Sequence, residues 1–127
     1  MSVRLSELVV NCQDPERLSR FWCAVLDYVE LGRELPDDGI EIGPPSGFGG
    51  LAPTIVFTRV DHAKQQPLRM HLDVNPVDRD QDAELERLLA LGAVPADVGQ
   101  TGEESWHVLA DPEGNEFCLL RKRLPPL

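Results

Sequence analysis

The feature that most constrains this chain is an internal repeat, because two stretches with the same pattern lie 64 positions apart. The matched pairs are Leu8 and Leu72, Val10 and Val74, Asn11 and Asn75, Asp14 and Asp78, Phe21 and Leu85, and Val25 and Leu89. Any two strand–helix units share a few apolar positions, but the shared asparagine and aspartate favour a duplicated unit. With 127 residues, the chain suits one domain built from two modules.

The first module, about residues 1–62, is expected to run strand, helix, strand, strand, strand. A strand is predicted over residues 3–12, and Asp14-Pro15 then gives an N-cap and a first helical residue. The helix should end near Asp27-Tyr28, and its apolar stripe is Leu18, Phe21, Trp22, Val25 and Leu26. Three short strands are predicted over residues 28–31, 39–42 and 54–60.

The second module, about residues 67–123, repeats this order after a polar connection. A strand over residues 68–74 precedes a helix that Asp78 caps, with Gln81 reaching back and Asp80 as a competing cap. Four acidic side chains of this helix, Asp80, Asp82, Glu84 and Glu86, are interpreted as a solvated face. After Gly92, strands are predicted over residues 94–98, 105–110 and 116–121, and a turn at residues 111–114 makes the last two a hairpin.

Charge and cysteine content exclude several classes of protein. The formal net charge of -10 repels phosphate backbones, which argues against nucleic acid and weakly favours a cationic ligand. No apolar run approaches the roughly 20 residues that span a membrane, and no apolar leader segment opens the chain. Three scattered cysteines argue against a disulfide framework, so we expect reduced thiols and a cytoplasmic protein.

Several short motifs, read in order along the chain, resemble the glyoxalase-like branch of the vicinal oxygen chelate superfamily. They are Asp14-Pro15 to Phe21-Trp22, Met70 to Val74, Leu91-Gly92-Ala93, and Leu109 to Phe117 with its Asp-Pro-Glu-Gly-Asn turn. The resemblance implies an α+β fold of two βαβββ modules, whose mixed sheet forms a cup with the helices outside. It also implies a small-molecule ligand in the cleft between the modules, and a homodimer.

The resemblance further suggests where a metal would bind. In metal-binding members the ligands come from the first and last strands of each module. By position, the first-strand sites fall on Glu7 and His71, which the repeat also relates. The last-strand sites fall near Thr58 and on Cys118, where metal-binding members usually have glutamate. One divalent ion, Zn, Ni, Mn or Fe, is therefore conceivable at Glu7 and His71, but the two departures favour no bound metal.

Glu7 and His71 are also the candidate catalytic residues. His71 shares the polar face of its strand with Asp73, and is either a ligand or general base or a hydrogen-bonded histidine of the sheet. Glu7 is either a ligand or base in the cleft or a surface charge on an edge strand. Asp73 is expected to orient His71, to contact the ligand, or to have a structural role.

The remaining candidates for ligand binding are Thr58, Trp106, His107 and Cys118. Trp106 and His107 point to opposite faces of one strand, so one of them should line the cleft. Cys118 lies in mid-strand, where a free cysteine commonly packs as a small buried residue.

Three functions remain open at this stage. The first is a metal-assisted lyase, isomerase or dioxygenase acting on a small oxygen-rich substrate. The second is a metal-free protein that sequesters a small molecule, as drug-resistance members of the superfamily do. The third is a metal-free enzyme that uses His71 or Glu7 for acid–base catalysis.

Overall fold

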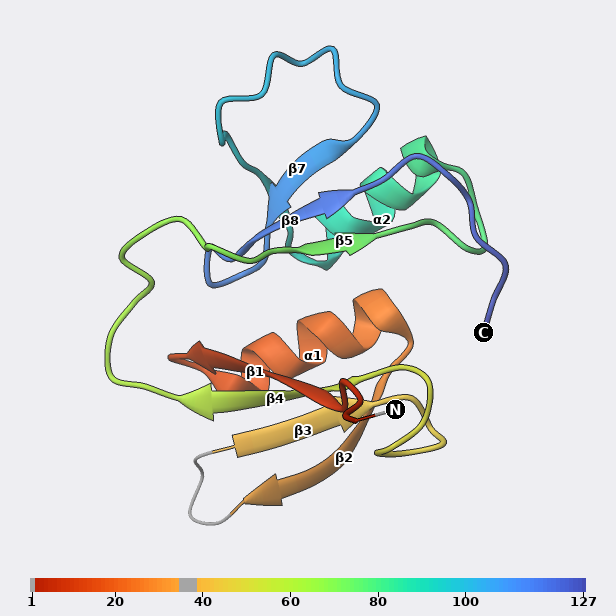
Figure 1. The fold of residues 1–127 in the computed structure, drawn as a ribbon. Helices are drawn as coiled ribbons and strands as arrows, with labels where there is room; N and C mark the ends of the chain where they lie inside the picture. The colour runs from red at the N-terminus through yellow and green to blue at the C-terminus, as the bar shows by residue number, and fades with distance from the viewer. Residues whose placement is uncertain (1, 35–38) are drawn as a thin grey trace. The chain divides into compact units, whose positions relative to one another are not determined.

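A computed structural model describes residues 2–34 and 39–127, and the chain divides into two compact units, Met1–Ala63 and Lys64–Leu127 (Figure 1). The division falls inside the polar segment that was predicted to join the modules. Each unit holds one four-stranded sheet and one long helix, and each is described here by itself.

The first unit begins with β1 (Glu7–Cys12) and α1 (Pro15–Leu26), followed by β2 (Val29–Glu34), β3 (Gly39–Gly43) and β4 (Thr54–Arg59). Its strand order is β1-β4-β3-β2. The first and last strands pair in parallel, and the other two pairings are antiparallel. The sheet is therefore mixed, and α1 connects β1 at one edge to β2 at the other.

The second unit repeats this topology. It contains β5 (Leu72–Val74), α2 (Gln81–Leu91), β6 (Val94–Pro95), β7 (His107–Ala110) and β8 (Glu116–Leu119). The strand order β5-β8-β7-β6 and the single parallel pair, β5 with β8, match the first unit element for element. This match confirms the α+β fold of two βαβββ modules.

The start of α1 follows the sequence signals closely. The Asp14 carboxylate accepts a hydrogen bond from the Arg17 backbone N–H at 3.1 Å, and Pro15 occupies the first helical position. Leu18, Phe21 and Trp22 are buried, and the two aromatic rings meet edge to face with centroids 5.3 Å apart. Burial of this stripe against the sheet is what stabilises a 12-residue helix that would be marginal alone.

The cap of α2 differs from the prediction. Asp80, not Asp78, is the N-cap, and its carboxylate accepts a hydrogen bond from the Ala83 N–H at 2.9 Å. Gln81 does not complete a capping box: its amide donates to the carbonyls of Ser105 and Leu119. Gly92 ends the helix in the left-handed conformation, with φ of 119°, as predicted.

The strands of the second unit are shorter than predicted. The Leu68 N–H donates to the Glu116 carboxylate instead of a strand neighbour, and Met70 is largely exposed, so β5 begins only at Leu72. After β6, the Gly99 N–H donates to the Asp97 carboxylate in a tight turn, which ends the pairing. Hydrogen bonds from the backbone to nearby side chains compete with the hydrogen bonds between strands. A pattern of apolar residues does not predict them.

The hairpin of β7 and β8 is confirmed as antiparallel. The Gly114 N–H closes its turn on the Asp111 carbonyl at 2.9 Å. Among the residues that the structure describes, no helix has the length and apolar character needed to cross a membrane.

Candidate functional site

The face of the second sheet that points away from α2 carries Asp73, Glu116 and Cys118. Asp73 pairs with Cys118 across the parallel β5–β8 ladder, and Val108 pairs with Cys118 from the other side. Because side chains alternate along a strand, the buried Phe117 and Leu119 occupy the opposite face, on which α2 lies (Figure 1). The face of Asp73 and Cys118 is called the β5–β8 face below.

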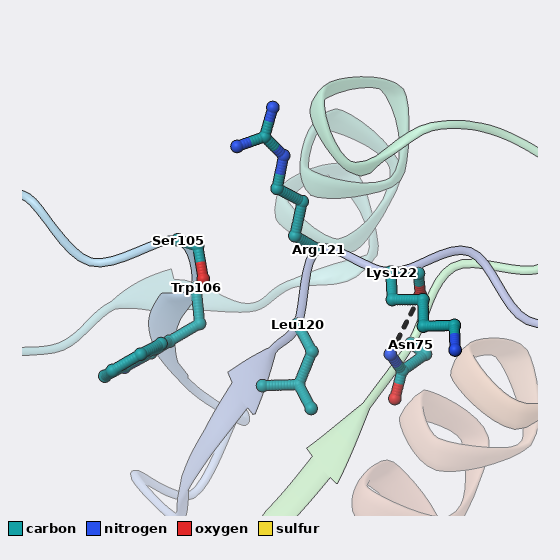
Figure 2. Close-up of a pocket in the computed structure, with 6 residues that line it drawn as sticks. All are labelled: Asn75, Ser105, Trp106, Leu120, Arg121 and Lys122. Carbon is teal, nitrogen blue, oxygen red and sulfur yellow. Dashed lines mark hydrogen bonds between the residues drawn. The ribbon is translucent and has the colours of Figure 1, made fainter.

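At the carboxyl end of these strands lies a shallow depression, open to solvent (Figure 2). It is lined by Asn75, Ser105, Trp106, Leu120, Arg121 and Lys122. Figure 2 shows the Trp106 ring and Leu120 on one side and Lys122 beside Asn75 on the other, while Arg121 extends towards α2. The Trp106 side chain thus lies on the accessible surface instead of in the core, with 44% of the residue exposed.

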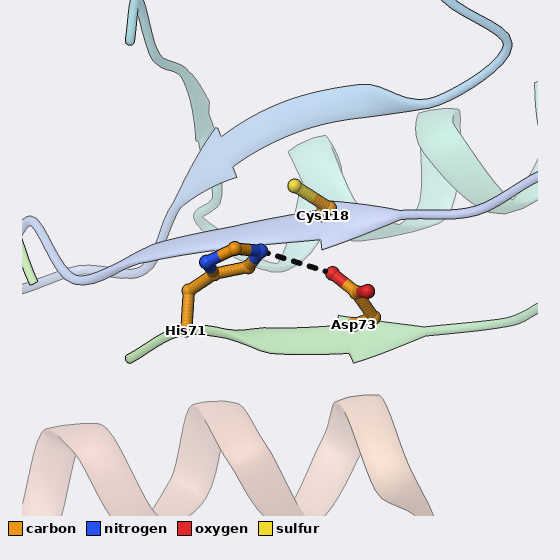
Figure 3. A group of neighbouring side chains, drawn as sticks. All are labelled: His71, Asp73 and Cys118. Atoms are coloured by element: carbon orange, nitrogen blue, oxygen red, sulfur yellow. Dashed lines mark ion pairs between the residues drawn. The ribbon is translucent and has the colours of Figure 1, made fainter. Parts of the chain in front are cut away.

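Three potential metal ligands meet on the β5–β8 face next to this depression (Figure 3). They are His71, Asp73 and Cys118, and their ligand atoms all lie within 4.8 Å of one another. The His71 Nε2 is 3.2 Å from a carboxylate oxygen of Asp73. His71 directly precedes β5, Asp73 is its central residue and Cys118 lies on β8, so the parallel pairing of two strands brings the three together. We call these three residues the His–Asp–Cys cluster.

The cluster combines exposed and buried groups. The side chains of His71 and Asp73 are each 49% exposed, whereas Cys118 is buried. Burial, the neighbouring Asp73 charge and a hydrogen bond from the thiol to that carboxylate all raise the pKa of Cys118. The cluster is thus a chain of contacts, from imidazole to carboxylate to thiol, in which His71 and Asp73 are open to solvent and Cys118 is not.

Glu116 lies on the same face, two positions before Cys118, but its carboxylate contacts other residues than those of the cluster. Its carboxylate pairs with Lys64 at 2.5 Å and accepts the Leu68 N–H at 2.9 Å. Burial raises the pKa of Glu116, but these contacts outweigh it and hold the pKa below its ordinary value. The pair fixes residues 64–68 to β8, so Glu116 positions the chain before His71.

The donors of the cluster fit a transition metal of borderline softness. An imidazole nitrogen, a carboxylate oxygen and a thiolate sulfur are all ligands that Zn²⁺ accepts. Neighbouring ligands of a tetrahedral zinc ion are about 3.5 Å apart, so the donors, within 4.8 Å, would close around an ion after small side-chain rotations. Three protein ligands leave at least one position for water or substrate, as in catalytic zinc sites.

In the first unit, Glu7 pairs with a residue of β4, Thr54. Because side chains alternate along a strand, Glu7 lies on one face of the sheet and the buried Ile55 and Phe57 lie on the other. Glu7 is exposed and pairs with Thr54, whose hydroxyl donates to the Glu41 carboxylate at 2.8 Å. Glu41 was not singled out in the sequence, although its position between Ile40 and Ile42 marks a carboxylate on the other face of a strand.

Thr58 lies on the same face as Glu7 but farther along β4. It pairs with Asn11, four residues beyond the Thr54 that pairs with Glu7, which is about 13 Å along a strand. The position that corresponds to Cys118 in the repeated ladder is Val56, which pairs with Val9 as Cys118 pairs with Asp73. The first unit therefore offers an apolar side chain where the second offers a thiol.

The structure groups the sequence candidates unevenly. It brings His71, Asp73 and Cys118 together and places Trp106 at the adjoining depression. His107 pairs with Leu119 and so occupies the opposite face, partly buried. Glu7 and Thr58 belong to the other unit, and the predicted pairing of Glu7 with His71 stays a prediction.

Sequence reasoning missed the cationic side of the depression. Its signal was present as Arg121-Lys122-Arg123, three successive cations in a chain with a net charge of -10. Asn75 was recognised as a repeated asparagine on the polar face of its strand but not as a site residue, whereas its amide donates to the Lys122 carbonyl at 2.8 Å.

Solved structures of the same fold include three informative neighbours. Fosfomycin resistance protein FosX from Mesorhizobium loti matches with a TM-score of 0.68 and 20% identity, covering 98% of this chain and 95% of that one. FosX from Listeria monocytogenes matches with a TM-score of 0.70 and 16% identity, covering 96% and 93%. A glyoxalase/bleomycin resistance protein/dioxygenase family enzyme from Burkholderia phytofirmans matches with a TM-score of 0.67 and 18% identity, covering 92% and 97%. At these identities the likeness concerns the fold.

A comparison with curated protein sequences finds no significant match. The sequence model of the glyoxalase-like domain, in contrast, matches residues 7–120, which run from the first residue of β1 to just beyond β8. Together with the duplicated βαβββ topology and the neighbours above, this match places the chain in the glyoxalase-like domain family of the vicinal oxygen chelate superfamily.

Proposed function

We propose that this protein binds a small oxygen-containing molecule at a divalent metal ion held by His71, Asp73 and Cys118. The observation that carries the proposal is the convergence of nitrogen, oxygen and sulfur donors within 4.8 Å on one accessible sheet face. A FosX variant of this fold from Listeria monocytogenes was solved with Mn(II) and 1S,2S-dihydroxypropylphosphonic acid, so one neighbour of this fold binds a divalent metal and a small oxygen-rich molecule. The proposal departs from the sequence prediction, which paired His71 with Glu7 alone.

The bound metal would supply Lewis-acid chemistry, polarising a substrate oxygen or lowering the pKa of a bound water. His71 and Asp73 are both half-exposed, so a ligand could approach the site from their side. The buried Cys118 anchors the inner side of the site, and Asp73 lies between the two. A lyase, isomerase or dioxygenase reaction is the enzymatic form of this proposal.

A metal-free binding protein is the second candidate. It is favoured by one observation: the thiol of Cys118 donates to Asp73, and Asp73 lies 3.2 Å from His71, so the three side chains satisfy one another without an ion. On this alternative the face would sequester a ligand, and His71 would serve as a hydrogen-bonding group.

Titration of the purified, chelator-treated protein with Zn²⁺ and Co²⁺ separates the two candidates. Calorimetry should show one ion per chain, and cobalt should give a thiolate charge-transfer band because Cys118 is a ligand. His71→Ala and Cys118→Ser should each weaken zinc binding by at least about tenfold. His62→Ala and Cys23→Ser are matched controls, since neither residue belongs to the cluster.

The metal proposal is wrong if the four variants bind zinc alike, or if the wild-type protein binds none. In the second case, the metal-free candidate predicts that a small ligand still raises the melting temperature. Glu7→Gln tests the ligand predicted from the repeat: a loss of zinc affinity equal to that of His71→Ala would add Glu7 to the site.

We further propose that the protein is a homodimer, as the family resemblance implies. Light scattering coupled to size exclusion should give twice the mass of one chain. A monomer mass at micromolar concentration would contradict this proposal.

A further inference from the structure

We propose that the depression beside the His–Asp–Cys cluster binds the anionic end of a small aromatic carboxylate, whose opposite, oxygen-bearing end reaches the metal. This inference rests on the proposed function and specifies the class of ligand. Three features of the depression support it: its positive charge, its apolar wall and its distance from the cluster.

The charge of the depression is opposite to that of the protein. The chain carries a net charge of -10, yet Arg121 and Lys122 both line this one surface. Arg123 is engaged, because its guanidinium donates to the carbonyls of Val77 and Asp78 at 2.7 and 2.8 Å. Within residues 2–34 and 39–127, neither Arg121 nor Lys122 forms an ion pair. A cation left without a carboxylate partner in an acidic protein is available to an anionic ligand.

The backbone that carries these cations is held in place. The Leu120 N–H donates to the Val74 carbonyl at 2.8 Å, and the Leu124 N–H donates to the Pro76 carbonyl at 2.9 Å. Between them, the Asn75 amide holds the Lys122 carbonyl. Lys122 therefore projects from a segment tied at three successive points, which reduces the entropy lost when a ligand binds.

The wall of the depression is apolar and flat. Trp106 and Leu120 supply it, and Gln81 positions both (Figure 2). The Gln81 amide donates to the carbonyl of Ser105, directly before Trp106, and to that of Leu119, directly before Leu120. These bonds anchor the backbone next to Trp106, whose partly exposed indole ring offers a stacking face for an aromatic ring.

The length of the ligand follows from the strands. Asn75 lies two residues beyond Asp73, and Leu120 lies two residues beyond Cys118, on the same face. Two residues of strand span about 7 Å, which is close to the separation of para substituents across one benzene ring. If the hydroxyl of such a ligand lies at the cluster, its para carboxylate would lie beside Asn75, next to which Figure 2 shows Lys122.

The test uses 4-hydroxybenzoate as the probe and 4-hydroxybenzamide as its uncharged analogue, with zinc-loaded and chelator-treated full-length protein. Calorimetry and tryptophan fluorescence should show that zinc-loaded protein binds the carboxylate more tightly than the amide. Lys122→Gln should weaken carboxylate binding about three- to fivefold, the effect of one exposed ion pair, and leave amide binding unchanged. Trp106→Leu should abolish the fluorescence response, because the other tryptophan, Trp22, is buried in the first unit.

Arg59→Gln is the matched control, since it removes one exposed positive charge from the end of β4. The inference is overturned if Lys122→Gln binds the probe like wild type, or if the amide binds as tightly as the carboxylate. If zinc loading does not change the affinity for 4-hydroxybenzoate, the inference that the hydroxyl end of the ligand reaches the metal is wrong. Zinc binding itself is measured separately on the same samples, so a protein that binds zinc but not the probe refutes the ligand class and leaves the metal site standing.

Discussion

At the scale of single residues, context decides the role of a charged side chain. Glu84 was placed on a solvated helix face by its sequence neighbours, and that interpretation was wrong, because the residue is only 6% exposed. Its carboxylate accepts hydrogen bonds from Arg79 at 2.7 Å and from Arg87 at 2.8 Å. Burial raises the pKa of Glu84, but the two guanidinium groups outweigh it and hold the pKa below its ordinary value.

Glu84→Gln is therefore expected to lower the free energy of unfolding by about 1–2 kcal/mol at neutral pH. Because the folded-state pKa is depressed, this contribution is present above the ordinary pKa of 4.5 and is lost as the pH falls through the folded value. Urea unfolding at about pH 7 and about pH 3 should show the difference between wild type and variant shrinking. Glu86→Gln is the control, an exposed neighbour on the same helix; an equal effect of both variants would contradict the prediction.

Cys118 shows how one residue can satisfy two interpretations. The sequence indicated a small buried residue, and the side chain is indeed buried, at 8% exposure. It also touches the site, because its pairing partner on β5 is Asp73. The alternation of a strand places a side chain on a face, but only the partner strand decides which side chains it meets there.

At the scale of elements, the start of α2 shows which of two possible capping residues is used. Asp78 and Asp80 both precede α2, and a capping box favoured Asp78. In the structure Gln81 is used to hold Ser105 and Leu119, so the box cannot form and the helix starts at Asp80. The helix therefore begins two residues later than predicted, and Gln81 makes tertiary contacts in place of the capping box.

Asp80→Ala should cost about 1 kcal/mol of stability, the usual effect of removing an N-cap. Asp78→Ala should cost much less, because Asp78 accepts the hydrogen bond of Arg123 with its backbone carbonyl, which alanine retains. Chemical denaturation of both variants under the same conditions measures this difference. A larger loss for Asp78→Ala would contradict the observed cap.

At the scale of the whole molecule, net charge does not describe the charge at each part of the surface. The acidic composition weakly favoured a cationic ligand, yet the depression beside the cluster presents Arg121 and Lys122. A sum over all residues describes the long-range field, whereas a bound ligand responds to the groups within a few ångströms.

The net charge should instead control how salt affects stability. With a formal charge of -10, mutual repulsion destabilises the folded chain, and added salt screens it. The melting temperature at neutral pH is expected to rise by a few degrees as sodium chloride increases from about 0.01 to about 0.3 M. Near the sequence pI of about 4.6 the same change in salt should have little effect. A melting temperature that falls with salt at neutral pH would show that local ion pairs outweigh the overall repulsion.

The sequence by itself determined the repeated order of elements, the α1 cap at Asp14, the end of α2 at Gly92 and the hairpin through residues 111–114. These features depend on local rules, namely periodicity, capping and turn chemistry, which act within a few residues of the chain. It also identified His71, Asp73 and Cys118 singly, from strand alternation and family resemblance.

Only the tertiary structure decided that these three side chains form one cluster, that Trp106 lines the depression and that His107 lies on the other face of the sheet. Asp73 and Cys118 are 45 positions apart in sequence and become neighbours through the register of a parallel pair. That register is set by packing and by hydrogen bonds between distant segments, such as those of Glu116, Gln81 and Asn75. A site assembled across strands therefore follows from the folded chain as a whole and not from any stretch of its sequence.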